Sequence, residues 1–122
     1  MTKFRVLLLA VGLVFSSTQS AFAHAELIKS FPVANSTLTK SPSFIQLEFG
    51  ETLTSLKSKT ANSITILDSK SHNIATTKIS VKKGIARVEL IDTLKSGRYT
   101  VKYRVVSADG HVLKSQFKFT LR

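Results

Sequence analysis

The stretch R-Y-T-V-K-Y-R-V-V, from Arg98 to Val106, carries the clearest structural signal in the chain. Apolar and aromatic side chains occupy every second position of it: Tyr99, Val101, Tyr103 and Val105. Lys102 and Arg104 lie between them. Successive side chains of a β-strand point to opposite faces, so the pattern predicts a strand with one buried and one solvated face.

Six more stretches on either side of this one have strand-like patterns: Ala25–Phe31, Ser43–Phe49, Ser63–Leu67, Asn73–Val81, Ile85–Leu90 and Val112–Leu121. Turn signals separate several of them, at Asp68–Asn73, Lys82–Gly84, Ser96–Gly97 and Asp109–Gly110. No window sustains a helical period, and Thr52–Ala61 is predicted to be a loop with one helical turn. About seven short strands predict an all-β fold, a small antiparallel Greek-key β-barrel or β-sandwich of Ig-like size.

Residues 1–23 have the three parts of a secretory signal peptide. Lys3 and Arg5 give a positive start, Val6–Phe15 is an apolar run, and Ala21–Ala23 has the A-x-A form of a cleavage site. A membrane anchor is the alternative, but ten helical residues reach only ~15 Å, about half of the ~30 Å hydrocarbon core. We therefore expect one domain, residues 24–122, exported to the periplasm and without a transmembrane segment.

The charge of the predicted mature chain is strongly positive. The full sequence has 18 Lys and Arg against 7 Asp and Glu, and Lys3 and Arg5 leave with the leader. The remaining lysines are dispersed along the chain, with few aromatic residues among them. That dispersion does not give the one-faced basic footprint of a nucleic-acid-binding protein. We expect no nucleic-acid partner, only solubility and weak attraction to anionic surfaces.

Sulfur chemistry is excluded from the mature chain. The sequence has no cysteine, and its single methionine is Met1. Cu(I) favours soft sulfur ligands, whereas Cu(II) accepts imidazole, amine and carboxylate. Any copper site here is therefore predicted to hold Cu(II).

Cleavage after Ala23 would place His24 at the amino terminus, where its α-amine and its imidazole Nδ1 can chelate one metal ion. The reference pKa values are ~7.7–8.0 for the amine and ~6.5 for the imidazole, so a metal can displace both protons near neutral pH. A second imidazole opposite this chelate would give three nitrogens in a T, which suits Cu(II). His111 is one candidate, and His72, in a polar turn, is expected to be a solvent-exposed residue.

Asp109 and His111 are separated only by Gly110, at the end of the long predicted strand. The pair can project from one end of the sandwich, with Asp109 as a ligand or a charge-balancing carboxylate. Each residue also has an ordinary explanation: Asp-Gly is a hairpin turn signal, and a histidine beside it is commonly a surface residue. The combination with a cleavage site that exposes His24 favours a metal site.

The chain resembles the CopC family of periplasmic copper-binding proteins. The similar segments are His24–Leu27, Ser30–Ala34, Ile45–Glu51, Gly97–Val101 and Tyr103–His111. The resemblance implies a small Greek-key β-barrel and one Cu(II) ion per mature chain. It also implies that the amine and imidazole of His24 and the imidazole of His111 bind the ion. Asp109 is a further ligand or a close carboxylate, and Glu51 is a second-rank candidate.

The chain also departs from the family pattern. Some members have a second, Cu(I) site in a Met-rich loop, but the corresponding region here, Thr54–Ser71, contains no Met. We therefore expect no Cu(I) site. Gly50 replaces a common Ser and Val112 a common Pro, and neither change removes a ligand. The resemblance implies a role in copper homeostasis or resistance, with an inner-membrane copper permease of the CopD kind as a partner.

Two other functions are compatible with parts of the pattern. Lytic polysaccharide monooxygenases also hold copper with an amino-terminal histidine and a second histidine. They offer an open metal position and a flat substrate face. This chain has no Trp for a sugar platform, and Asp109 would disfavour oxygen activation, so we predict that it is not an enzyme. A metal-free Ig-like structural module is the other alternative, because β-sandwiches host many functions.

Overall fold

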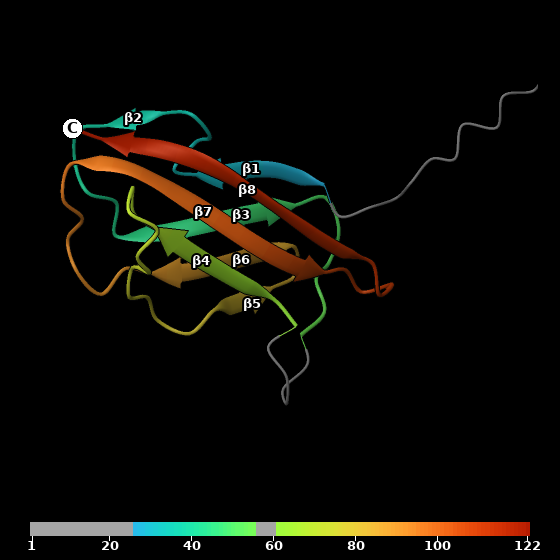
Figure 1. Ribbon diagram of the computed structural model, residues 1–122. Coiled ribbons are helices and arrows are strands. Elements are labelled where there is room, and N and C mark those ends of the chain that lie inside the picture. Colours follow the sequence, from blue (N-terminus) through green and yellow to red (C-terminus); the bar gives the residue numbers. More distant parts are fainter. Residues whose placement is uncertain (1–25, 56–60) are drawn as a thin grey trace, which may run out of the picture.

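A computed structural model of the protein describes residues 26–55 and 61–122. In this part of the chain two four-stranded sheets pack face to face (Figure 1). One sheet has the order β1-β3-β6-β5, with bounds Leu27–Phe31, Phe44–Phe49, Ile85–Glu89 and Ser80–Lys82. The other has the order β2-β8-β7-β4, with bounds Thr37–Leu38, Val112–Leu121, Gly97–Val106 and Ser63–Leu67. The predicted all-β sandwich is confirmed, with eight strands among the described residues in place of about seven.

Buried and solvent-facing side chains alternate along β7, as the sequence predicts. Tyr99, Val101, Tyr103 and Val105 are all buried, whereas the residues between them are exposed or half-buried. The aromatic rings join neighbouring elements: Tyr99 stacks on Phe119 of β8 at 5.4 Å between ring centroids, and Tyr103 meets Phe49 of β3 edge-on at 5.7 Å. The core is therefore the space between the inner faces of the two sheets.

One predicted strand, Asn73–Val81, is largely wrong. Only Ser80–Lys82 forms a strand there. Asn73 makes an isolated bridge with Leu67 in one sheet, and Thr76 makes another with Leu90 beside the other sheet. The segment crosses between the two sheets, so it cannot pair continuously with either, even though its Thr and Ile residues favour extended backbone.

Two smaller differences separate the prediction from the structure. The two-residue strand β2 was not predicted; it pairs in parallel with the end of β8. Residues 52–55 of the predicted helical turn contain no helix, and residues 56–60 lie outside the described part of the chain. Within the described residues there is no helix with the length and apolar character needed to cross a membrane.

Candidate metal centre

The β7–β8 turn carries both Asp109 and His111. The hairpin ladder ends at the pair Val106 and Val112, and the Ser107 N–H then bonds to the His111 carbonyl at 2.9 Å. The Gly110 N–H closes a tight turn onto the Ser107 carbonyl, also at 2.9 Å. Gly110 has φ of 92°, a conformation that side-chain-bearing residues rarely adopt. The turn therefore projects Asp109 and His111 from one end of the sandwich, as predicted.

The Asp109 carboxylate is held by three hydrogen bonds inside this turn. Its Oδ1 accepts from the Ser107 hydroxyl and, at 3.2 Å, from the His111 N–H. Its Oδ2 lies 2.7 Å from Nδ1 of the His111 ring. The hydrogen bond from Ser107, followed by those from His111, lowers the pKa of Asp109 to about 2. Because an unfolded Asp titrates near 3.9, these contacts stabilise the turn above that pH, and their contribution is lost as the pH falls toward about 2.

The contact between Asp109 and His111 has a consequence for metal binding. A carboxylate on Nδ1 fixes the ring orientation and the tautomer, so that Nε2 is the nitrogen a metal would take. This arrangement favours Asp109 as a close carboxylate that orients His111, an orienting role that the sequence did not predict.

Residues Gly50–Thr54, which we call the bridging segment, connect the start of β1 to this turn. The Gly50 N–H bonds to the Glu26 carbonyl at 2.9 Å, and the Thr52 carbonyl accepts from the Ala108 N–H at 2.9 Å. The next residue, Leu53, forms a β-bridge with Ser107. The start of β1 and the β7–β8 turn consequently lie at the same end of the sandwich (Figure 1).

Buried polar side chains hold this end of the fold together. Asn62, only 5% exposed, accepts from the Val106 N–H at 2.8 Å and donates to the Thr54 carbonyl at 2.6 Å. Ser107 is fully buried and donates to Asp109. Neither residue is among the site residues predicted from the sequence. Ser107 is separated from Asp109 by one residue, so a turn can bring their side chains within hydrogen-bonding distance, whereas nothing local identifies Asn62.

The other candidates are placed as follows. Glu51 lies on the bridging segment and is half-buried, whereas His24 lies outside the described residues. His72 is exposed, and its Nδ1 lies 3.4 Å from Oδ2 of Asp68 in the turn after β4. That turn follows Leu67, the strand partner of Thr100, and Thr100 is about 23 Å along β7 from Ser107. Within residues 26–55 and 61–122, no three His, Asp or Glu side chains cluster closely enough to hold a metal.

Comparisons with known proteins agree with this architecture. The family model described as "CopC domain" matches residues 27–122. Protein YobA of Escherichia coli is 35% identical over 108 residues, covering 86% of this chain and 84% of YobA. The crystal structure of CopC from Methylosinus trichosporium is 29% identical with a TM-score of 0.69, covering 80% and 93% of the two chains. PcoC, a methionine-rich copper resistance protein from Escherichia coli, is 30% identical with a TM-score of 0.68, covering 82% and 100%. By the family-model match and the identity to YobA, the chain belongs to the CopC family.

Proposed function

We propose that this protein is exported to the periplasm, where, after cleavage behind Ala23, it binds one Cu(II) ion. The ligands are the α-amine and imidazole Nδ1 of His24 and the imidazole Nε2 of His111. Asp109 holds His111 in place and balances part of the positive charge of the ion. These donors are the amine and imidazole nitrogens that Cu(II) accepts in a tetragonal arrangement.

One observation carries the proposal: the bridging segment hydrogen-bonds Glu26 on one side and Ala108 on the other. His24 precedes Glu26 by two residues, and two residues of chain reach at most about 7 Å. Asp109 directly follows Ala108. If cleavage leaves His24 as the first residue, this spacing keeps it within reach of the end of the sandwich that carries Asp109 and His111, which supports the proposed ligand set.

The role that we propose is copper homeostasis or resistance, with the ion as cargo. CopC-family membership and the copper resistance function in the name of PcoC support it. Unlike the methionine-rich PcoC, this chain has no Met after Met1 and no Cys, so we propose one Cu(II) site and no Cu(I) site. An inner-membrane permease of the CopD kind is the proposed recipient or donor.

A Cu(II) titration of the processed protein tests this function. Mass spectrometry first reads the amino terminus, which we expect to be His24. We then expect one equivalent of Cu(II) to bind at pH 7. Affinity should fall as the pH is lowered, because protons compete with Cu(II) for the amine and imidazole nitrogens. Unchanged visible absorbance and melting temperature on adding Cu(II) would favour a metal-free module. Repeated turnover on a polysaccharide with peroxide would instead point to an oxidative enzyme.

The Asp109→Asn variant tests the orienting role of the carboxylate. The amide keeps the shape of Asp109 but removes the charge that favours the Nδ1–H tautomer. We expect Cu(II) affinity to fall by about 10- to 100-fold, the usual cost of losing a hydrogen-bond partner of a metal ligand. Asp68→Asn is the matched control, because Asp68 pairs with His72 in the turn after β4. Equal Cu(II) affinity in the two variants would contradict the role given to Asp109.

A further inference from the structure

The outer face of sheet β2-β8-β7-β4 is basic and contains no acidic residue. Residues of β7 and β8 that face outward form three successive rungs: Arg104 with Lys114, Lys102 with Gln116, and Thr100 with Lys118. Each rung carries at least one cation. Lys102, Lys114 and Lys118, which are dispersed along the sequence, are thus gathered with Arg104 on one surface by the strand register.

The carboxylates of the chain all lie elsewhere. The sequence has seven Asp and Glu residues, all within the described part. Glu48 and Glu89 belong to strands of the other sheet or their ends, and the remainder are in segments at the ends of the sandwich: Glu26, Glu51, Asp68, Asp92 and Asp109. In the described residues, the ion pairs involve Asp68, Glu89 and Asp109, and none of them includes Lys102, Arg104, Lys114 or Lys118.

Repulsion between the cations on this face destabilises the isolated folded protein. Arg104 and Lys114 are direct cross-strand partners, and like charges placed opposite each other destabilise a sheet. The Arg104 guanidinium donates to the Ala61 carbonyl at 2.6 Å, which fixes its position without neutralising it. An anionic surface outside the molecule would relieve this repulsion.

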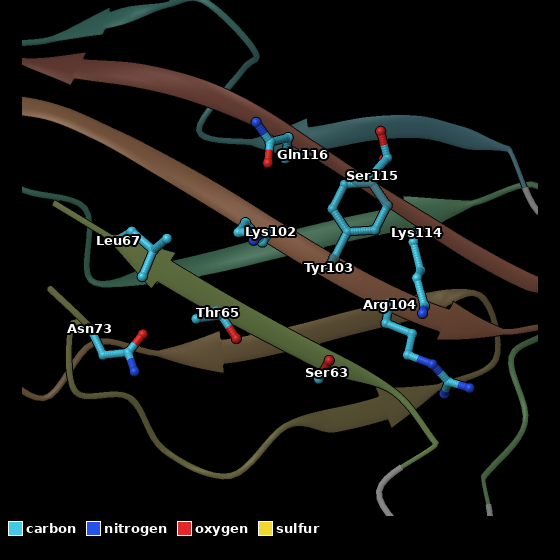
Figure 2. Close-up of a pocket in the computed structure, with 10 residues that line it drawn as sticks. All are labelled: Ser63, Thr65, Leu67, Asn73, Lys102, Tyr103, Arg104, Lys114, Ser115 and Gln116. Carbon is cyan, nitrogen blue, oxygen red and sulfur yellow. The ribbon is translucent and has the colours of Figure 1, made fainter. Parts of the chain in front are cut away.

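The shallow relief and the side chains of this face indicate what kind of anionic partner fits it. A shallow groove of about 550 Å³ crosses β4, β7 and β8. The polar and charged residues that line it include Ser63, Thr65, Lys102, Arg104, Lys114 and Gln116 (Figure 2). The large hydrophobic side chains that are exposed in the described residues lie in other segments, apart from Val112 at the edge of the face. Protein interfaces depend on buried aromatic or aliphatic anchors at their centre. A lipid headgroup layer requires only positive charge spread over an extended face.

We propose that this face docks on a membrane surface rich in anionic phospholipid. Strands β7 and β8 have ten residues each and give the face a length of about 33 Å. Its end at Arg104 and Lys114 adjoins the turn that carries His111. Docking would therefore hold the candidate metal centre at the membrane with a defined orientation. The face includes none of the proposed copper ligands, so docking is tested on metal-free protein and does not depend on the proposed function.

Two matched triple variants provide the test, by sedimentation with vesicles at low salt. One replaces Lys102, Lys114 and Lys118 with Gln; the control replaces Lys29, Lys78 and Lys82, which are exposed on or beside β1 and β5. Both variants lose the same charge. We expect the first to weaken partitioning onto vesicles of phosphatidylglycerol and phosphatidylcholine by about 100-fold. The control should lose less than about tenfold, because charges more than ~10 Å from the membrane are largely screened.

Site-specific labelling checks the orientation independently. The chain has no cysteine, so Thr65→Cys on the basic face and Ser80→Cys on β5 each accept one fluorescent label. Anionic vesicles should shield the label at position 65, but not that at position 80, from an aqueous quencher. Equal losses in the two triple variants, or equal shielding at both positions, would overturn the proposal. Binding to poly-L-glutamate without binding to the vesicles would also overturn it and point to an acidic protein partner.

Discussion

Protein that keeps Ala21–Ala23 ahead of His24 is expected to bind Cu(II) about 100- to 1000-fold more weakly than protein that begins at His24. In the longer form the α-amine of His24 is a peptide nitrogen and no longer offers an unblocked amine beside the ring. Structural zinc sites with four ligands supply about 10–16 kcal/mol, or about 2.5–4 kcal/mol per ligand, and each 1.4 kcal/mol is a factor of ten. Isothermal titration of the two forms, with their termini confirmed by mass spectrometry, measures the difference.

Two histidine variants complete this experiment. His24→Ala keeps the terminal amine but removes the imidazole, and we expect a loss of similar size. His72→Ala should leave Cu(II) affinity unchanged, since His72 lies in the turn at the far end of β7. Equal affinity in the extended and processed forms would rule out the amino-terminal ligand. A large loss in His72→Ala would move the site to the other end of the sandwich.

The strands could be predicted from the sequence wherever apolar and polar residues alternate because one face of the strand is buried. β4 and β8 begin and end at the predicted residues, and β7 differs from its prediction by one residue. Each of these strands buries one face only, so its side chains alternate between apolar and polar, except in the exposed first half of β8. The crossing segment Asn73–Ile79 has a suitable composition for a strand, but the path of the chain between the sheets decides its structure. β2 is only two residues long, and its parallel partner lies more than eighty residues away.

The candidate site could be predicted only in part. The Asp109–His111 spacing and the turn around Gly110 are local, so they can be found in the sequence. The approach of Glu26 to Ala108 depends on long-range hydrogen bonds through the bridging segment, and no local pattern encodes them. The basic face also depends on long-range pairing that no local pattern encodes. Arg104 and Lys114 are ten positions apart, and only the hairpin register makes them neighbours.

The bridging segment leads to a second large effect, at a residue remote from the proposed ligands. Gly84→Ala is expected to destabilise the fold by about 2–3 kcal/mol, the upper range for overpacking a core. A Cβ at position 84 would lie 2.6 Å from the Phe49 carbonyl oxygen and 2.9 Å from that of Glu51. Both obstructing atoms belong to backbone, so no side-chain rotation relieves the clash. Thermal unfolding should show the melting temperature falling by about 10–20 °C.

Gly84→Ala should also weaken Cu(II) binding, because the backbone that must shift joins Glu26 to Ala108. Gly50→Ala is the matched control on the same segment. Its added Cβ would lie 3.6 Å from Ile28 Cδ1, an ordinary van der Waals contact, so both stability and copper affinity should stay close to the unmodified protein. If Gly84→Ala lowers the melting temperature while Cu(II) affinity, measured well below that temperature, is unchanged, the bridging segment does not position the two halves of the site. If both properties fall together, the steric fit of one glycine against two carbonyl groups links the packing of the sandwich to its metal chemistry.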